Sequence, residues 1–404
     1  MTNAPTLVDQ SGAYDATVDS MPGRDQAVTL ESGTVRTTVL PQVEHTGDAV
    51  TLVRSARPRF QEKRALGEGG IGEVVAAYDQ DIGREVAIKR LRAGMQGPTS
   101  IARFVDEIRT VGALEHPNIV PIHDVGVNDD GSLYFVMRCV QGQTLESIIE
   151  KLAAGDALAH EQWTFERRVH VFRQLLDAVA FAHERGFVHR DIKPANVMVG
   201  AYGEVFLMDW GIAKPVGAND APVTSSAQVP ALTTGRVTST HAGAIVGTPA
   251  YMSPEQARGE PVDGRSDVYS LSVVFHEWLG LRHYLHDAKT MEAVLHGVQH
   301  GHAPFASFVP SPYQSPAPAD LAHFVKKGLA KEPSQRYQSV REMIDRLDAR
   351  EEGLVPIQCP VTLTKRTTHE WLRFVDRHPA IVTAMVVLAV LGSVGATVWH
   401  FVRG

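Results

Sequence analysis

The chain has 404 residues, enough for two or three structural units, and its 44% hydrophobic and 21% charged content is ordinary for a globular protein. A formal net charge of −7 argues against a nucleic-acid-binding protein, so no nucleic-acid partner is expected. Cys139 and Cys359 lie far apart and outside any C-x-x-C pair, which excludes a disulfide framework and fits a reducing compartment. The first residues carry no basic-then-apolar pattern, so no secretory signal is expected.

The N-terminal part divides into an arm and a β-rich region. Residues 1–58 are rich in Thr, Ser, Asp, Gly and Pro without periodicity, which predicts a disordered arm. From residue 59, short β-type runs broken by glycines precede further elements. These are a strand over 85–89, a helix over 100–113, and strands over 119–125 and 133–136 joined near Asp130-Gly131, a hairpin signal.

After Gly142 the pattern becomes helical. Thr164 is a candidate N-cap for a long helix whose apolar residues form one stripe up to Ala182. Residues 215–247 are full of Ser, Thr, Gly and Ala and predict a long flexible loop. The other expected elements are strands over 197–199 and 205–207 and helices over 266–279, 291–298, 321–329 and 340–347. We therefore predict an α+β, bilobal fold, with a β-rich lobe over 59–140 and a larger helical lobe over 141–350.

The C-terminal region predicts a membrane anchor. Between Ala380 and Phe401 there is no Asp, Glu, Lys or Arg, and about 20 such residues can cross a ~30 Å hydrocarbon core as a helix. We expect a juxtamembrane linker over 351–379, a transmembrane helix over 380–401 and a tail over 402–404, with no extracellular sensor domain. A buried apolar helix is the alternative.

Charge and small residues set two further expectations for this segment. The cations that precede it are Lys365, Arg366, Arg373 and Arg377, and only Arg403 follows, so the positive-inside rule places the N-terminal side in the cytoplasm. Gly392 and Ala396 form a small-xxx-small face that would allow a homodimer, although lipid-facing small residues explain it as well.

Two N-terminal motifs are suited to phosphate binding. The run Gly67-Glu68-Gly69-Gly70-Ile71-Gly72-Glu73-Val74 fits G-x-G-x-x-G-x-V, in which glycines let backbone N–H groups approach phosphates. A dinucleotide-binding fold would need a helix directly afterwards, whereas a strand follows here; a glycine hairpin without ligand remains open. Lys89 ends the apolar strand and needs a charge partner, for which Glu107 suits better than Asp106. A solvated surface lysine is the alternative.

The segment from His189 to Asn196, with the sequence His-Arg-Asp-Ile-Lys-Pro-Ala-Asn, is the most specific. It combines a candidate base, Asp191, with cations and an amide in one loop that ends in a strand. Asp209-Trp210-Gly211 follows the next β run, and a carboxylate before a glycine suits a magnesium ligand on a hinge.

In this order, the motifs resemble those of the eukaryotic-type protein kinase family over about residues 60–350. Lys193, two residues after Asp191, is the family's serine/threonine marker. The Ser253-Pro254-Glu255 variant and the membrane helix most resemble bacterial single-pass membrane Ser/Thr kinases. Two departures stand out: Trp210 replaces the usual Phe, for which we expect packing to survive, and Arg138 occupies a hinge position that is often acidic.

The resemblance implies roles for individual residues. Asp191, Lys193 and Asn196 are catalytic: the carboxylate takes the hydroxyl proton and the lysine steadies the γ-phosphate. Asn196 and Asp209 hold Mg²⁺, with Mn²⁺ as an alternative. The residues expected to bind ATP are Leu66, Gly67, Glu68, Gly69, Gly70, Ile71, Gly72, Glu73, Val74, Lys89, Glu107, Met137 and Cys139. Glu255 pairs with Arg336, and Asp267 braces the catalytic loop.

The function that follows is transfer of the ATP γ-phosphate to Ser/Thr hydroxyls of proteins, by a membrane-tethered enzyme with its kinase domain in the cytoplasm. Arg190 beside Asp191 implies control by loop phosphorylation, with Thr238, Ser239 and Thr240 as candidate autophosphorylation sites. The alternatives are a pseudokinase scaffold that binds ATP without turnover and a small-molecule kinase of related fold.

Overall fold

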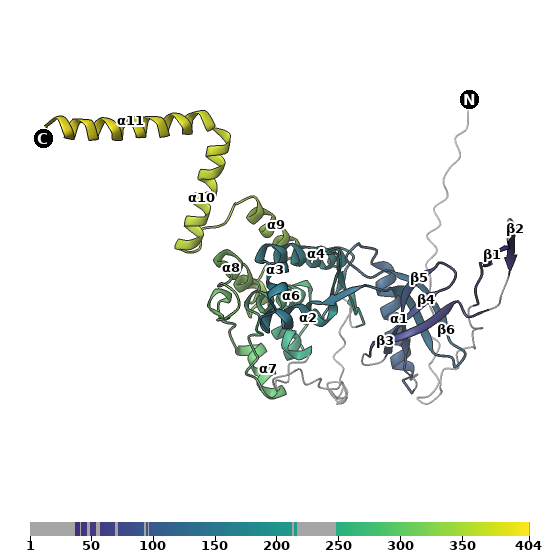
Figure 1. The fold of residues 1–404 in the computed structure, drawn as a ribbon. Coiled ribbons are helices and arrows are strands. Elements are labelled where there is room, and N and C mark those ends of the chain that lie inside the picture. The colour runs from purple at the N-terminus through teal and green to yellow at the C-terminus, as the bar shows by residue number, and fades with distance from the viewer. Residues whose placement is uncertain are drawn as a thin grey trace, which may run out of the picture.

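The chain forms a β-rich lobe, then a helical lobe, then two helices that project from the helical lobe (Figure 1). The computed structural model describes residues 37–40, 42–46, 49–53, 57–68, 72–92, 94–95, 97–211, 214–215 and 248–403. The predicted α+β, bilobal organisation is confirmed.

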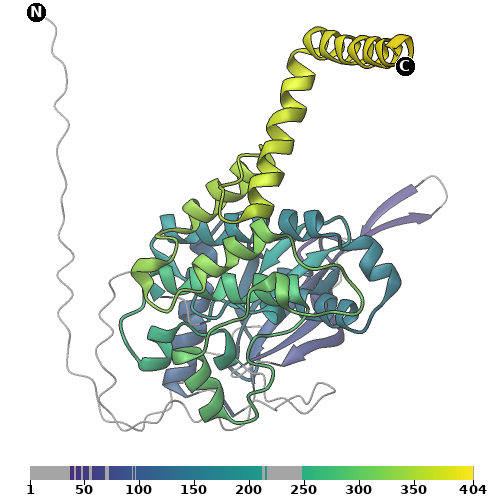
Figure 2. The ribbon, with the colours of Figure 1, turned by 90° about the vertical axis from the view of Figure 1, so that its left-hand side faces the viewer.

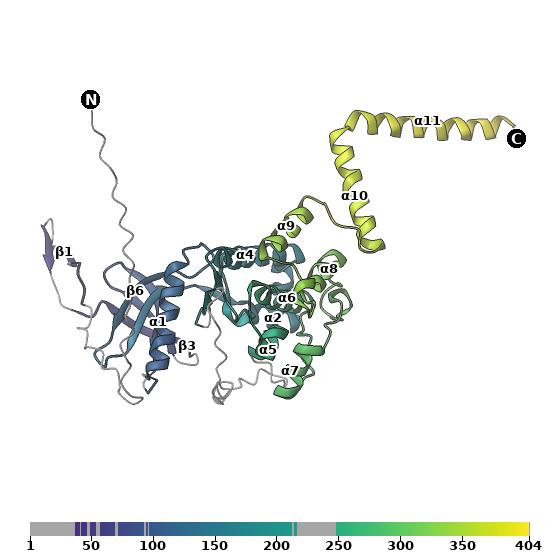
Figure 3. The ribbon, with the colours of Figure 1, turned by 180° about the vertical axis from the view of Figure 1, so that it is seen from behind.

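The first lobe is built on a five-stranded antiparallel sheet with strand order β3-β4-β5-β7-β6. Its elements are β3 (Phe60–Glu68), β4 (Gly72–Asp79), β5 (Arg84–Leu91), helix α1 (Pro98–Ala113), β6 (Ile122–Val127) and β7 (Leu133–Arg138). Figure 3 shows α1 alongside this sheet.

Alternation along β5 decides which side chains face α1. Ile88 packs with Val75 and Tyr134 in one apolar cluster, whereas Leu91 packs with Phe104 of α1 in another. Since side chains of a strand alternate between faces, Lys89 shares the face of Leu91 and points toward α1. The sheet therefore presents one lysine to the helix that carries Glu107.

The second lobe is mainly helical. Its strands are β8 (Gly142–Thr144), β9 (Phe187–Val188), β10 (Val197–Gly200), β11 (Val205–Leu207) and β12 (Lys214–Pro215). Its helices are α2 (Leu145–Ala153), α3 (Ala157–Gln162), α4 (Phe165–Glu184), α5 (Pro254–Arg258), α6 (Gly264–Gly280), α7 (Met291–His300), α8 (Ala319–Gly328) and α9 (Val340–Glu351).

Helix α6 is the centre of this lobe, because most of its residues are buried. Phe172 of α4 stacks on Phe275 of α6 at a centroid distance of 4.0 Å. The long helix α4 begins as predicted, since Thr164 accepts a hydrogen bond from the Arg167 N–H. The packed α4–α6 pair gives a rigid base to the loop over 189–196, which follows α4 and β9.

Part of the N-terminal arm, between residues 37 and 53, contains regular structure, whereas residues 1–36 lie outside the described residues. Strands β1 (Gln42–Thr46) and β2 (Ala49–Val53) form an antiparallel hairpin within the range predicted to be disordered. The backbone N–H groups of Val39 and Leu40 also donate to the Asp81 carboxylate. The disordered-arm prediction is therefore wrong for this segment; its period-2 run of Val43, His45, Val50 and Leu52 indicates strands.

Two helices occupy the C-terminal region. Helix α10 (Pro360–Arg377) lies where a linker was expected, and helix α11 (Pro379–Arg403) matches the expected apolar helix in extent. Figure 2 shows α10 rising from the helical lobe and α11 leaving it at a sharp angle. Within the described residues no single helix meets the length and hydropathy needed to span a bilayer; α10 together with Pro379–Val394 does, with a 102° bend between them.

Candidate active site

Lys89 connects the two lobes through an ion-pair network. Its Nζ lies 2.5 Å from Oε1 of Glu107 on α1 and 3.3 Å from Oδ1 of Asp209 in the helical lobe. Glu107 is 4% exposed, whereas Asp106 is exposed. The expected pairing of Lys89 with Glu107 rather than Asp106 is confirmed.

The network keeps Lys89 charged. Burial lowers the pKa of Lys89, but the carboxylates of Asp209 and Glu107 outweigh it and hold the pKa above its ordinary value. A lysine buried without such partners would lose its proton. The strand therefore presents a permanent ammonium group beside the glycine-rich segment, where it can attract a phosphate.

Asp191 is the central carboxylate of the loop between β9 and β10. Lys193 donates from Nζ to its Oδ2 at 2.7 Å, and the Asn196 amide donates to its Oδ2 at 3.2 Å and to its backbone oxygen at 2.9 Å. Burial raises the pKa of the Asp191 carboxyl against the opposing charge of Lys193. These contacts fix the orientation of a carboxylate whose proton affinity is increased.

Asp267 of α6 holds the start of this loop. Its carboxylate accepts from the backbone N–H of His189 at 2.8 Å and of Arg190 at 2.9 Å, and it contacts the His183 ring at 2.7 Å. Burial raises the pKa of Asp267, but His183 and the backbone donors hold it below its usual range, so the group is an anion. Arg190 adopts φ +70°, a conformation that costs energy in a non-glycine residue. The bracing contact expected of Asp267 is therefore present.

Asp209 is placed by the packing of its neighbours. It has φ +61°, and Trp210 after it is 2% exposed, with its ring 4.5 Å from that of His189. The indole N–H donates to the Leu207 oxygen at 3.4 Å. A Cβ on Gly211 would come within 3.3 Å of the Glu107 carboxylate, so glycine suits the position. The packing expected of Trp210 is confirmed.

The two carboxylate-bearing segments converge. The backbone N–H of Met208 donates to the Asn196 backbone oxygen at 2.9 Å, which ties the segment of Asp209 to the loop over 189–196. Desolvation raises the pKa of the Asp209 carboxyl, but the positive charges of Lys89 and Lys193 outweigh this effect and hold the pKa below its ordinary value. Because Lys193 also bonds to Asp191, one lysine lies within the electrostatic reach of both carboxylates.

The glycine-rich segment is described at both ends. Gly72 is constrained, because a Cβ there would lie 2.9 Å from the Arg90 backbone oxygen. The residues expected to bind ATP that are seen in β3 and β4 are Leu66, Gly67, Glu68, Gly72, Glu73 and Val74; Gly69, Gly70 and Ile71 lie outside the described residues. Met137, the residue before the end of β7, packs against the cluster of Leu91 and Phe104, and Cys139, just after β7, is a half-buried free thiol.

Arg138, the unusual hinge residue, is half-exposed. Its guanidinium lies 4.8 Å from the centre of the Phe206 ring and 4.0 Å from Glu204. Both partners belong to the helical lobe, so this cation faces the β10–β11 hairpin from the strand that ends the first lobe.

Glu255 and Arg336 form the expected ion pair. Two guanidinium nitrogens of Arg336 lie 2.7 Å and 2.8 Å from the Glu255 carboxylate oxygens, and the Ser266 hydroxyl donates to the same carboxylate. Burial raises the pKa of Glu255, but Arg336 and Ser266 hold it below the usual range. This bidentate pair fixes α5, which follows the segment expected to receive the substrate.

Some contacts at this site were not predicted. Gln256 donates from Nε2 to the Arg190 backbone oxygen at 2.9 Å and forms a capping box with Ser253. The Ser-x-x-Gln spacing could have indicated this box. Tyr251 donates to the half-buried Glu277 carboxylate at 2.6 Å, a pairing that no local pattern indicates. The phosphorylation candidates Thr238, Ser239 and Thr240 lie outside the described residues.

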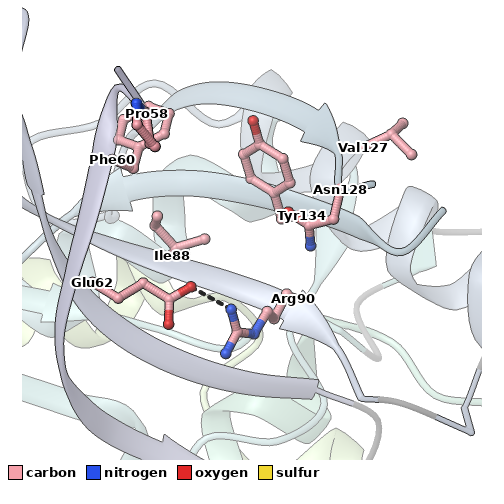
Figure 4. Close-up of a pocket in the computed structure, with 8 residues that line it drawn as sticks. All are labelled: Pro58, Phe60, Glu62, Ile88, Arg90, Val127, Asn128 and Tyr134. Atoms are coloured by element: carbon pink, nitrogen blue, oxygen red, sulfur yellow. Dashed lines mark hydrogen bonds and ion pairs between the residues drawn. The ribbon is translucent and has the colours of Figure 1, made fainter. Parts of the chain in front are cut away.

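A pocket of about 170 Å³ lies on the other face of the β-sheet (Figure 4). Ile88 and Arg90 line it together with Phe60, Glu62 and Tyr134, and Arg90 pairs with Glu62. By the alternation of β5, this is the face opposite Lys89. The pocket is therefore separate from the site described above.

The chain matches a family model described as "Protein kinase domain" over residues 60–346. It is 33% identical over 319 residues to the serine/threonine-protein kinase PknD of Protochlamydia amoebophila. It is 37% identical over 290 residues to the probable serine/threonine-protein kinase SCO3848 of Streptomyces coelicolor and to the serine/threonine-protein kinase PknB of Mycobacterium tuberculosis.

These matches cover 77%, 70% and 70% of this chain but only 32%, 39% and 42% of the respective relatives. The chain thus corresponds to about a third to two-fifths of the length of the curated relatives it matches. From the extent of the family match and the geometry above, we conclude that this chain belongs to the protein kinase family.

Proposed function

We propose that this protein is an ATP-dependent serine/threonine protein kinase. The observation that carries the proposal is the arrangement of Asp191 with Lys193 and Asn196, beside the Lys89–Glu107–Asp209 network. A hydroxyl base, a γ-phosphate cation and an α/β-phosphate cation are the parts that phosphoryl transfer to protein requires. Lys193 and the relatives' names favour serine and threonine as acceptors.

The donor set fits a divalent cation of the Mg²⁺ type. Asn196 uses its amide nitrogen in both bonds to Asp191, which leaves the amide oxygen available, and the Asp209 side chain is about half exposed. One carboxylate and one amide oxygen are hard ligands of the kind Mg²⁺ shares with nucleotide phosphates, and Mn²⁺ would suit them too. When bound, the cation neutralises charge on the phosphates.

The chain's own residues then perform three tasks. Asp191 accepts the proton of the attacking Ser or Thr hydroxyl, helped by its raised pKa. Lys193, held against Asp191, supplies positive charge to the transferred phosphoryl group. Lys89 holds the α- and β-phosphates, and the strands β3 and β4 carry the glycines Gly67 and Gly72 that admit them. Positioning and electrostatics account for the catalysis.

A phosphate-transfer assay distinguishes a kinase from a pseudokinase scaffold. The full chain is incubated with γ-labelled ATP, Mg²⁺ and a generic protein substrate, and labelled amino acids are identified after hydrolysis. We expect phosphoserine and phosphothreonine. ATP binding without any transfer would favour the scaffold, and phosphotyrosine alone would contradict the Ser/Thr assignment.

We also propose that the loop between Pro215 and Thr248 is autophosphorylated, at Thr238, Ser239 or Thr240. The supporting observation is that Arg190 directly precedes Asp191 in the sequence, because arginine pairs well with phosphate. Mass spectrometry of the protein expressed alone should find phosphate in this loop. Its absence from active protein would contradict the proposal.

We also propose a membrane anchor: α11 holds a kinase domain over 59–350 to the membrane, on the cytoplasmic side of a bacterial cell. The large apolar side chains of α11 project into solvent; those at or above half exposure are Ile381, Val386, Val387, Leu388, Val390, Leu391, Val394 and Trp399. The full chain should float with lipid vesicles, and the Val387→Arg/Leu388→Arg variant should not. Pairing of two copies through Gly392 and Ala396 stays a prediction that crosslinking in the same vesicles would test.

A further inference from the structure

Helix α10 separates its side chains by polarity. Successive residues turn by about 100° around a helix, which places Trp371, Leu372 and Val375 on one side and Thr362 and Arg373 opposite them. We define the apolar face of α10 by residues Val361, Thr364, Thr368, Trp371, Leu372 and Val375. Trp371 and Leu372 are 54% and 55% exposed, and Val361 is 63% exposed. These three apolar side chains are therefore more than half exposed, whereas Val375 is half-buried.

Two contacts attach α10 to the helical lobe. Thr362, which lies off the apolar face, is fully buried, and Lys365, at the edge of that face, lies 3.0 Å from both oxygens of Asp320 on α8. Asp320, 6% exposed, also pairs with Arg350 of α9 at 2.5 Å. Because Thr362 is buried against the lobe while Val361, Trp371 and Leu372 are more than half exposed, these apolar side chains face away from the kinase domain.

The bend between α10 and α11 relates this face to the bilayer. The two helices meet at 102°, with α11 counted over Pro379–Val394. A helix that crosses a bilayer near its normal therefore leaves α10 nearly parallel to the membrane surface. Over its full extent, Pro379–Arg403, α11 has 25 residues and is about 37 Å long, more than the hydrocarbon thickness of ~30 Å; counted only to Val394, it does not qualify as a span by itself. The geometry brings α10 to the level of the head groups.

The composition of α10 suits that level. Trp371 and Phe374 stack with ring centroids 5.8 Å apart, and aromatic side chains favour the membrane interface. The helix carries four cations, Lys365, Arg366, Arg373 and Arg377, against two carboxylates, Glu370 and Asp376. Lys365 pairs with Asp320 of α8 and Arg366 pairs with Glu370, which leaves Arg373 and Arg377 against Asp376. An excess of positive charge on a cytoplasmic interfacial helix attracts anionic lipid.

We propose that α10 is an interfacial helix whose apolar face inserts into the surface of an anionic bilayer and, through Asp320, fixes the kinase domain against the membrane. The proposal rests on the membrane anchor proposed for α11. A lipid surface is favoured over a second copy of the chain because α10 leads directly into the apolar helix α11 and because two α10 helices of the same net charge would repel.

Spin-label accessibility in full-length protein tests this. In a background carrying Cys139→Ser and Cys359→Ser, single cysteines are placed at Thr368, Trp371 and Val375 on the apolar face. His369 and Arg377 on the other side serve as matched controls, and Val387 reports on α11. The labelled proteins are reconstituted in nanodiscs of phosphatidylglycerol and phosphatidylcholine. Oxygen collects in the acyl region, whereas a nickel chelate stays in water.

For each label we compare its accessibility to oxygen with its accessibility to the nickel chelate. We expect this ratio to be at least about tenfold higher for labels at 368, 371 and 375 than for labels at 369 and 377. Label 387 should be embedded. If the label at 387 is embedded while all five α10 labels are equally accessible to the nickel chelate, the interfacial helix is refuted and the anchor stands. If the label at 387 is accessible to the nickel chelate, the anchor and the inference both fail. Spin–spin coupling between apolar-face labels, with protection from both reagents, would identify a second copy as the occupant and overturn the proposal.

A variant pair adds a second measurement. Leu372→Glu, with the label at 375, should expose that label to nickel and leave 387 embedded. The matched His369→Glu variant places the same charge on the opposite side and should leave both labels unchanged. Equal effects of the two variants would contradict insertion of the apolar face.

Discussion

Lys89 and Asp209 lie 120 residues apart in the chain, yet Nζ of one is 3.3 Å from Oδ1 of the other. The lysine belongs to the β-rich lobe and the aspartate to the helical lobe, so this contact joins the lobes at the proposed phosphate site. Glu107 completes the network at 2.5 Å from the same Nζ. The relationship makes the position of α1 part of the active site, because α1 carries the third charge.

Glu107→Gln should therefore reduce phosphoryl transfer without unfolding the protein. The amide keeps a hydrogen-bonding oxygen but removes the charge that holds Lys89 against α1. We expect kcat/KM for ATP to fall by about 10- to 100-fold, equivalent to about 1.4–2.7 kcal/mol. Asp106→Asn, at the exposed neighbouring position, is the matched control and should retain activity within about twofold. Equal losses in both variants would contradict the network.

Asp267→Asn should weaken both activity and stability. The carboxylate accepts from two backbone N–H groups and contacts His183, whereas an amide oxygen cannot satisfy all three as well. Leaving a buried donor unsatisfied costs about 1–3 kcal/mol, and Arg190 loses the contact that stabilises its positive φ. Denaturant unfolding and a transfer assay measure both effects. Asp263→Asn, at the exposed start of the same helix, should lose about 1 kcal/mol or less and keep its activity.

The Glu255–Arg336 pair predicts a non-additive stability effect. Glu255→Gln alone leaves a buried guanidinium without its counter-charge, and Arg336→Met alone leaves a buried carboxylate, so each should cost about 3–5 kcal/mol. The double variant buries neither charge, so its loss of unfolding free energy should be smaller than the sum of the two single losses by at least about 1 kcal/mol. Urea unfolding of the wild type, the two single variants and the double variant gives this double-mutant cycle. Strict additivity would show that the two side chains do not interact.

Glu277 predicts a pH dependence of folding stability. Burial raises the pKa of the Glu277 carboxyl from 4.5 to about 7. The hydrogen bond from Tyr251 lowers this pKa, and the nearby negative charge of Glu146 raises it. The folded state thus holds a proton that the unfolded state releases above about pH 4.5. The stabilisation is complete below that pH and is lost as pH rises through about 7.

Glu277→Gln removes this titration. Relative to wild type, the variant should gain up to about 3 kcal/mol of unfolding free energy between pH 4 and pH 8, measured by denaturant titration at each pH. Tyr251→Phe removes the hydroxyl that lowers the pKa of Glu277. In this variant the pH-dependent loss of folding stability should therefore occur at a higher pH than in wild type. A difference between wild type and Glu277→Gln that does not change with pH would contradict the buried neutral carboxyl.

Local patterns were enough to predict most of the fold. Helix α4 follows from the Thr164 cap and its apolar stripe, and β10 and β11 from short apolar runs. The candidate site could be predicted because its groups occur in ordered motifs with fixed spacing. For Glu107, helical spacing alone separated the buried position from exposed Asp106.

Long-range and marginal features could not be predicted in this way. The contacts from Gln256 to Arg190 and from Tyr251 to Glu277 join residues 66 and 26 positions apart, which no periodicity reveals. The β1–β2 hairpin was missed because polar, glycine-containing composition outweighed a short period-2 pattern. Helix α10 was missed because its charges suggested a linker, although its apolar residues recur on one side of a helix.

The central claim is that the Asp191 carboxylate takes the proton of the attacking hydroxyl. The most direct measurement compares single-turnover phosphoryl transfer by wild type and Asp191→Asn at saturating ATP and Mg²⁺, together with the ATP dissociation constant. We predict a rate reduced by at least about 10²–10⁴-fold with the dissociation constant changed less than about threefold. A rate within about threefold of wild type, with ATP still bound, would contradict the account.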